Sequence, residues 1–325
     1  MKYATQLLAS RAFSQIHLDV STHNLGHAYM LVSSDVEALE ELALLMACDI
    51  YCQHSLCMED DCPDCRKVLS YGHSDVHHVY KNNDKKNITV DVITNMIDNS
   101  MLTSYEGGTK LFIVHGADAM LPQAQNKLLK TLEEPTQNVC IVLLVSNPAS
   151  LLNTIKSRVR NVTLDYFEPN VIRGLLNGDS RRVSIAVNCA DGSLSRAVAI
   201  LEDDDYINQF EQVVEAIVSL KKSKDVALIA CRDIFAKDKI STTLSIIEII
   251  MRDFMLVNSD NNNLVLSTSF SDQVGEIAKT YSLPAISVII QKINEARQKL
   301  AVNCLSSNVI ENLLFSFLEV RYKCQ

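Results

Sequence analysis

The amino-terminal half of the chain alternates short runs of aliphatic and β-branched residues with longer stretches of helical spacing. Three such runs are Ala28–Val32, Lys110–Val114 and Val139–Val145. This alternation is typical of a parallel sheet whose strands are joined by crossover helices. We therefore predict an α/β domain over residues 1–165.

Proline and glycine are unevenly distributed along the 325 residues. Of the six prolines, only Pro284 lies beyond Pro169. Because both residue types interrupt regular elements, their scarcity predicts a carboxyl-terminal part that is nearly all helix. Apolar residues at three- and four-residue steps, such as Phe210, Val213 and Ile217, give one of these helices a face that must be buried.

Glycines and acidic residues divide this helical part in two. Gly178 interrupts short helical pieces, and the acidic run at 202–205 closes their segment. We predict a small helical lid domain over residues 166–205. Residues 206–325 contain helices that are apolar nearly all round and need neighbours on several sides, so they are predicted to form an all-α domain.

The charge balance limits the partners that the chain can bind alone. Lys plus Arg total 30 against 39 Asp plus Glu, a formal net charge of −9. Since this charge disfavours autonomous binding to a polyanion, any contact with DNA is expected to be local or shared with partners. The longest apolar run is far shorter than the roughly 20 residues that span a bilayer, and residues 1–20 lack a hydrophobic signal core. We expect no membrane partner and a cytoplasmic location.

Cysteines are concentrated between residues 48 and 65. In Cys62-Pro63-Asp64-Cys65, the two thiolates have the spacing that lets both reach one tetrahedral ion. A long chain without an export signal keeps its thiols reduced, so the cluster indicates a metal. Zinc in a closed four-sulfur site would be structural, because no coordination position is left for a substrate. Three ligands are Cys57, Cys62 and Cys65, and the candidates for the fourth are Cys48, Cys52, His54 and His73.

A nucleotide-binding domain of this class carries a phosphate-binding loop between its first strand and the following helix. The turn here reads Val32-Ser33-Ser34-Asp35-Val36-Glu37, and no Gly-Lys dipeptide occurs in the chain. After the second run, His115-Gly116-Ala117-Asp118 lacks the adjacent carboxylates that bind magnesium in an ATPase. The sequence therefore predicts that this chain binds no ATP.

The segment 117–135, ADAMLPQAQNKLLKTLEEP, strongly resembles bacterial clamp loaders of the AAA+ family. Residues 140–159 are similar to the family's sensor 1 and Ser-Arg-Cys regions, with Val159 in place of the cysteine. The strong resemblance covers residues 27–165, and 192–196 is similar to the sensor 2 stretch. It implies an AAA+ P-loop-type parallel sheet domain with a zinc module, then a helical lid and a helical collar that serves oligomerisation.

The resemblance also implies a ligand set for the zinc module, at about residues 48–65. The family inserts this module after the first helix, and the first ligand ends that helix. This selects Cys48, together with Cys57, Cys62 and Cys65. The Cys57 to Cys62 spacing is longer than the family's, so Cys52 stays an alternative to Cys48.

Within the family, the gamma and tau subunits keep both nucleotide motifs, whereas one further subunit typically lacks them in many bacteria. The two losses imply a stator subunit that binds no ATP. Arg158, in its Ser157-Arg158 context, would then act as an arginine finger in trans on a neighbouring ATPase subunit. The implied partners in the hetero-oligomer are gamma or tau and the delta subunit, with the sliding clamp reached through the complex and primer-template DNA bound weakly or through the complex.

Other interpretations remain open. A clamp-loader ATPase of gamma or tau type would require nucleotide affinity, and a zinc-dependent DNA-binding regulator would require sequence-specific DNA binding by an acidic chain. Arg158 could instead form only a surface salt bridge. Arg196 would meet nucleotide in an ATPase and is expected to be structural here. His77, His78 and His115 are expected to be ordinary strand or turn residues.

Overall fold

The computed structural model describes residues 1–52, 62–82, 85–259 and 271–323. Across these ranges, no helix is both long and apolar enough to cross a membrane.

The chain forms two compact units. Unit 1 comprises Met1–Phe167 together with the short segment Ser193–Ser195, and unit 2 comprises Glu168–Gly192 and Arg196–Gln325. The chain therefore returns briefly to unit 1 between two parts of unit 2. The predicted boundary between a lid and a collar lies inside unit 2 and stays a prediction.

A five-stranded parallel sheet in the order β2-β3-β4-β1-β5 forms the centre of unit 1. Its central strands are β1 (Ala28–Val32), β3 (Lys110–Val114) and β4 (Val139–Val145), which are almost entirely buried. The edge strands β2 (Val76–Val79) and β5 (Arg160–Thr163) are shorter and partly exposed. Strands covered on both faces need apolar side chains on both, which explains the continuous apolar runs in the sequence.

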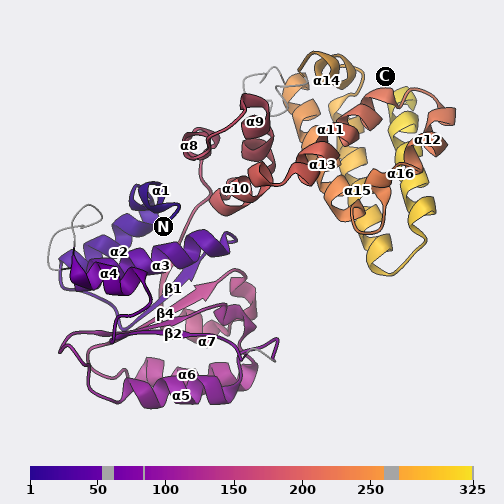
Figure 1. Ribbon diagram of the computed structural model, residues 1–325. Coiled ribbons are helices and arrows are strands. Elements are labelled where there is room, and N and C mark those ends of the chain that lie inside the picture. Colours follow the sequence, from indigo (N-terminus) through magenta and orange to yellow (C-terminus); the bar gives the residue numbers. More distant parts are fainter. Residues whose placement is uncertain (53–61, 83–84, 260–270, 324–325) are drawn as a thin grey trace. The chain divides into compact units, whose positions relative to one another are not determined.

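Helices cover both faces of the sheet (Figure 1). On one face lie α1 (Ala4–Leu8), α2 (Arg11–Ser21), α3 (Val36–Tyr51) and α4 (Pro63–Leu69). On the other lie α5 (Val90–Ser100), α6 (Pro122–Glu133) and α7 (Asn153–Lys156). The short turns η1 (Ala117–Ala119) and η2 (Pro148–Ser150) follow β3 and β4. The core between the sheet and α5 and α6 includes Met30, Phe112, Leu128, Leu132 and Leu143.

Among the described residues of unit 2, all regular elements are helices. Its elements are α8 (Pro169–Leu175), α9 (Ser180–Cys189), α10 (Leu194–Glu202, whose first two residues belong to unit 1), α11 (Asp204–Ser219), α12 (Ser223–Ala230), η3 (Asp233–Phe235), α13 (Ile240–Asn258), α14 (Ser271–Ala278), α15 (Leu283–Ala301) and α16 (Ser306–Lys323).

Helix α13 contributes many buried side chains to the core of unit 2. It packs against α11, α14 and α15, and α15 in turn packs against α16. Large side chains such as Phe210, Phe254 and Phe317 are only 1% exposed in this core. A parallel sheet with helices on both faces, followed by an all-helical unit, confirms the predicted fold class.

Candidate functional site

The turn between β1 and α3 is the position at which a phosphate-binding loop would lie. Asp35 ends this turn as the N-cap of α3, and its Oδ1 accepts a hydrogen bond from the backbone N–H of Ala38 at 3.1 Å. Aspartate is a favoured N-cap because its carboxylate satisfies a free backbone donor of the first helical turn. At 6% exposure the side chain is buried. An internal carboxylate thus lies where a helix N-terminus would otherwise bind phosphate.

The same carboxylate binds the short segment that returns to unit 1. Ser195 donates from its hydroxyl to Asp35 Oδ1 at 2.6 Å and from its backbone N–H to Oδ2 at 3.1 Å. Ser193 donates its hydroxyl to Oδ2 at 2.9 Å. These residues belong to the stretch that resembles sensor 2. Asp35 therefore joins the N-terminus of α3 to the stretch that resembles sensor 2. In an ATPase, these two elements both face the nucleotide.

A second departure from an ATPase lies at the end of β3. His115 follows the strand directly, and its Nδ1 lies 3.0 Å from Glu40 Oε1, while its Nε2 lies 3.0 Å from Nδ1 of His78. The ring of Tyr80 stacks on His115 at 4.2 Å between centroids. Burial lowers the pKa of His115, and burial followed by the charge of His115 lowers the pKa of His78 to about 4. An imidazole thus follows β3 directly, at the position where an ATPase presents a carboxylate for magnesium.

The carboxylate further along this loop is also engaged. Asp118 Oδ2 accepts a hydrogen bond from the hydroxyl of Ser146 at 2.8 Å. Ser146 follows β4, in the region that resembles sensor 1. The bond joins the loops after β3 and β4, so Asp118 takes a structural role between two strand ends.

The cysteine cluster lies where α3 ends and α4 begins. Cys48 is in the last turn of α3, Cys52 caps this helix, and Cys62 and Cys65 lie at the start of α4 around Pro63. The Sγ atoms of Cys52, Cys62 and Cys65 all lie within 4.8 Å of one another. Zinc–sulfur bonds of about 2.3 Å place tetrahedral ligands about 3.8 Å apart, so small adjustments suffice to bind one ion.

The thiols of the cluster interact with one another. Burial raises the pKa of Cys48 to about 11, opposed by a hydrogen bond with Cys65. Backbone N–H groups of Cys65 and Asp64 lower the pKa of Cys62, because they stabilise its thiolate. Four cysteines, at positions 48, 52, 62 and 65, are thus close enough to bind a metal ion. Cys57, the remaining predicted ligand, lies outside the described residues.

Arg158 lies between α7 and β5, on the surface of unit 1. Its Nη2 forms an ion pair with Glu133 Oε1 at 2.7 Å, and its Nη1 donates to the carbonyl oxygen of Thr154 at 3.0 Å. The side chain is 36% exposed. Glu133, which ends α6, is a partner that the sequence analysis does not identify.

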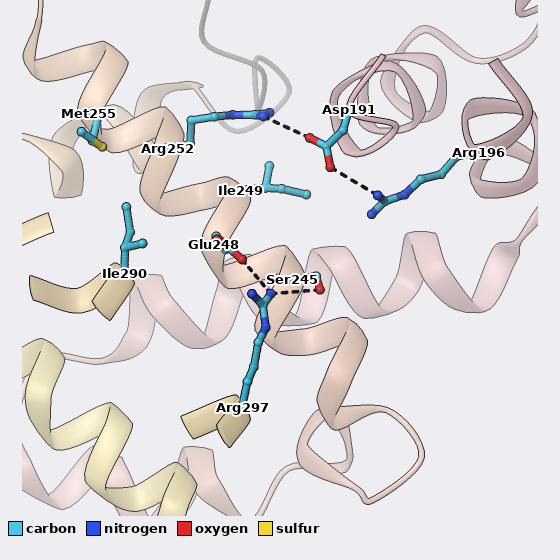
Figure 2. Close-up of a pocket in the computed structure, with 9 residues that line it drawn as sticks. All are labelled: Asp191, Arg196, Ser245, Glu248, Ile249, Arg252, Met255, Ile290 and Arg297. Atoms are coloured by element: carbon cyan, nitrogen blue, oxygen red, sulfur yellow. Dashed lines mark hydrogen bonds and ion pairs between the residues drawn. The ribbon is translucent and has the colours of Figure 1, made fainter. Parts of the chain in front are cut away.

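Arg196, in the stretch that resembles sensor 2, pairs with Asp191 of unit 2. Figure 2 shows it beside Asp191, with Nη1 to Oδ2 at 3.2 Å, and Arg252 reaches the other oxygen of Asp191 at 3.2 Å. These three residues line a cavity of about 420 Å³, and Arg297, which pairs with Glu248 at 2.6 Å, lines it too. This arrangement supports a structural role for Arg196.

Comparison with known proteins finds subunits of DNA polymerase III. The family model for "DNA polymerase III, delta subunit" matches residues 8–168. The delta' subunit of DNA polymerase III from Bacillus subtilis is 24% identical over 96% of this chain and 97% of its own length. That of Pseudomonas aeruginosa is 31% identical over 41% of each chain. Among solved structures, a gamma subunit-related protein of Thermotoga maritima is 16% identical and covers 95% of this chain and 99% of its own, with a TM-score of 0.45.

The parallel sheet, its strand order and the helical unit that follows have the architecture of the AAA+ class, and the matching family model and relatives make the chain a clamp-loader subunit. In this chain the first turn carries the Asp35 N-cap, and the imidazole of His115 follows β3. The chain belongs to the family of delta-prime subunits of DNA polymerase III.

Proposed function

We propose that this chain is the stator of a bacterial clamp loader. As a clamp-loader subunit it acts in DNA replication. In the proposed role it binds no ATP, assembles in the cytoplasm with gamma or tau ATPase subunits and the delta subunit, and helps the complex load the sliding clamp on primed DNA. Contacts with the clamp and DNA are made chiefly through the complex, as the net charge of −9 favours.

The observation that carries this proposal is the position of the Asp35 carboxylate. It accepts hydrogen bonds from the N-terminal turn of α3 and from Ser193 and Ser195. A nucleotide phosphate at this point would meet a buried negative charge at close range, and it would have to displace four hydrogen bonds. The geometry disfavours a gamma or tau type ATPase for this reason.

In this role Arg158 contributes to a neighbour's active site. The half-exposed guanidinium on the surface of unit 1 would reach the γ-phosphate bound by an adjacent ATPase subunit. There it would offset the charge that develops on the transferred phosphoryl group. The acidic partner Glu133 keeps the arginine on the surface of the isolated chain.

The zinc module is proposed to be structural. Soft thiolate donors fit Zn²⁺, and a four-sulfur set leaves no open position for a substrate. We assign the ligands as Cys48, Cys57, Cys62 and Cys65, with Cys52 as the alternative for one position. The metal would join the end of α3 to the start of α4, two helices that pack against each other.

The proposed function is tested by reconstituting the clamp loader with and without this chain. The chain is mixed with the gamma or tau and delta subunits of the same organism, and clamp loading on primed DNA is measured with and without it. We expect all subunits to co-elute as one complex and loading to require this chain. A fully active loader assembled without it, or sequence-specific DNA binding by the chain alone at physiological salt, would refute the stator role.

A further inference from the structure

Arg158 is oriented by three acceptors of its own chain. Nη2 forms an ion pair with Glu133 Oε1 at 2.7 Å, and the Thr154 carbonyl oxygen and the Ser157 hydroxyl accept hydrogen bonds from Nη1 at 3.0 and 3.3 Å. A guanidinium has five N–H donors. Within the described residues, the Nε–H and one hydrogen of Nη2 have no acceptor. The partly exposed guanidinium of Arg158 thus keeps two N–H donors for a ligand from outside the chain.

Glu133 is held on a rigid element. It is the last residue of α6, next to Leu132, which is 3% exposed and packs in the core against the sheet. A carboxylate in the last turn of a helix is opposed by the negative end of the helix macrodipole. An ion pair between two half-exposed side chains also adds little stability. The contact is therefore better explained by the orientation it imposes on Arg158 than by stability.

We propose that Glu133 is the positioning residue for Arg158 in the clamp-loader reaction, an inference that rests on the trans role proposed above. Arginine has four rotatable side-chain bonds, and a mobile guanidinium would meet the γ-phosphate only part of the time. The ion pair with Glu133 and the bond to Thr154 restrict the fork before the neighbour's ATP arrives. The two remaining donors then meet the phosphate without a further loss of rotamer freedom.

The test uses the reconstituted complex and follows DNA-stimulated hydrolysis as a function of ATP concentration. Glu133→Gln removes the charge at nearly constant size. We expect kcat for the site that Arg158 completes to fall about tenfold, with KM within about twofold, because orientation and not binding is lost. Glu134→Gln is the matched control: it makes the same change one residue later, where the side chain has no hydrogen bond or ion pair among the described residues, and it should leave both constants unchanged.

A double-mutant cycle with Arg158→Ala shows whether Glu133 acts through the arginine. When Arg158 is already alanine, Glu133→Gln should cause no further loss of kcat. When Arg158 is present, Glu133→Asp should hydrolyse ATP faster than Glu133→Gln, because it keeps the negative charge. Equal losses in both backgrounds, or faster hydrolysis by Glu133→Gln, would overturn the inference. If the complex with Arg158→Ala hydrolyses ATP at the wild-type rate, the trans role of Arg158 is refuted, and the positioning role with it. A different outcome is slow hydrolysis with Arg158→Ala and wild-type hydrolysis with Glu133→Gln. This second outcome refutes the positioning role alone.

Discussion

Replacing Arg158 with alanine is expected to slow ATP hydrolysis at the neighbouring site by about 10³-fold or more. The physical reason is that a desolvated guanidinium placed against the γ-phosphate stabilises charge that develops only in the transition state. The measurement is single-turnover hydrolysis by the reconstituted clamp loader on primed DNA. In the steady state, the rate of ATP hydrolysis by the whole complex should fall at least by the fraction that this one site contributes.

Assembly of this variant should be unchanged. Arg158 is on the surface, and its ion pair with Glu133 contributes about 1 kcal/mol or less to the free energy of unfolding. Arg158→Lys keeps a positive charge but loses the planar fork, so it should restore little of the rate. Arg181→Ala removes another exposed arginine, paired with Glu211, and should hydrolyse ATP normally. Wild-type hydrolysis by Arg158→Ala in a fully assembled complex would rule out the finger.

Removing the metal is expected to have the largest effect on stability. We predict about one zinc per chain, lost in Cys62→Ser, with a fall of about 4 kcal/mol in the free energy of unfolding. The reason is that Cys62 and Cys65 anchor the start of α4, and their buried thiols lose the ion that joins them to α3. Metal analysis and denaturant unfolding measure both effects.

Matched serine variants separate the ligands from other cysteines. Cys231→Ser changes an exposed cysteine of unit 2 and should keep both the zinc and the stability. Cys57→Ser should lose the metal, whereas Cys52→Ser should retain it if Cys48 is the first ligand. A protein that contains no zinc when purified from metal-replete cells, and yet unfolds with full stability, would remove the zinc module from the account.

The central part of the fold was predictable from the sequence because it depends on burial. The runs that form β1, β3 and β4 are apolar on both faces, and the structure places these strands at the predicted residues. The edge strands β2 and β5 were not singled out, since each has four residues and polar side chains such as His77 or Arg160. For short edge strands, pairing with a neighbour outweighs the local pattern.

The candidate site was predictable only where its residues are close in sequence. The cysteine cluster follows from local spacing, and the structure brings Cys48, Cys62 and Cys65 together with Cys52. The bonds of Asp35 to Ser193 and Ser195 join residues about 160 positions apart, and no local pattern encodes them. The sequence shows what the first turn lacks. Only the structure shows that the Asp35 carboxylate accepts hydrogen bonds both at the N-terminus of α3 and from Ser193 and Ser195.

The central claim is that this subunit keeps the AAA+ architecture without binding nucleotide. Isothermal titration of the isolated chain with ATP and magnesium, with the gamma or tau subunit of the same organism as the positive control, tests it most directly. We predict no binding heat for this chain at up to about 1 mM ATP, where the control saturates. Magnesium-dependent binding with a micromolar dissociation constant would contradict the account.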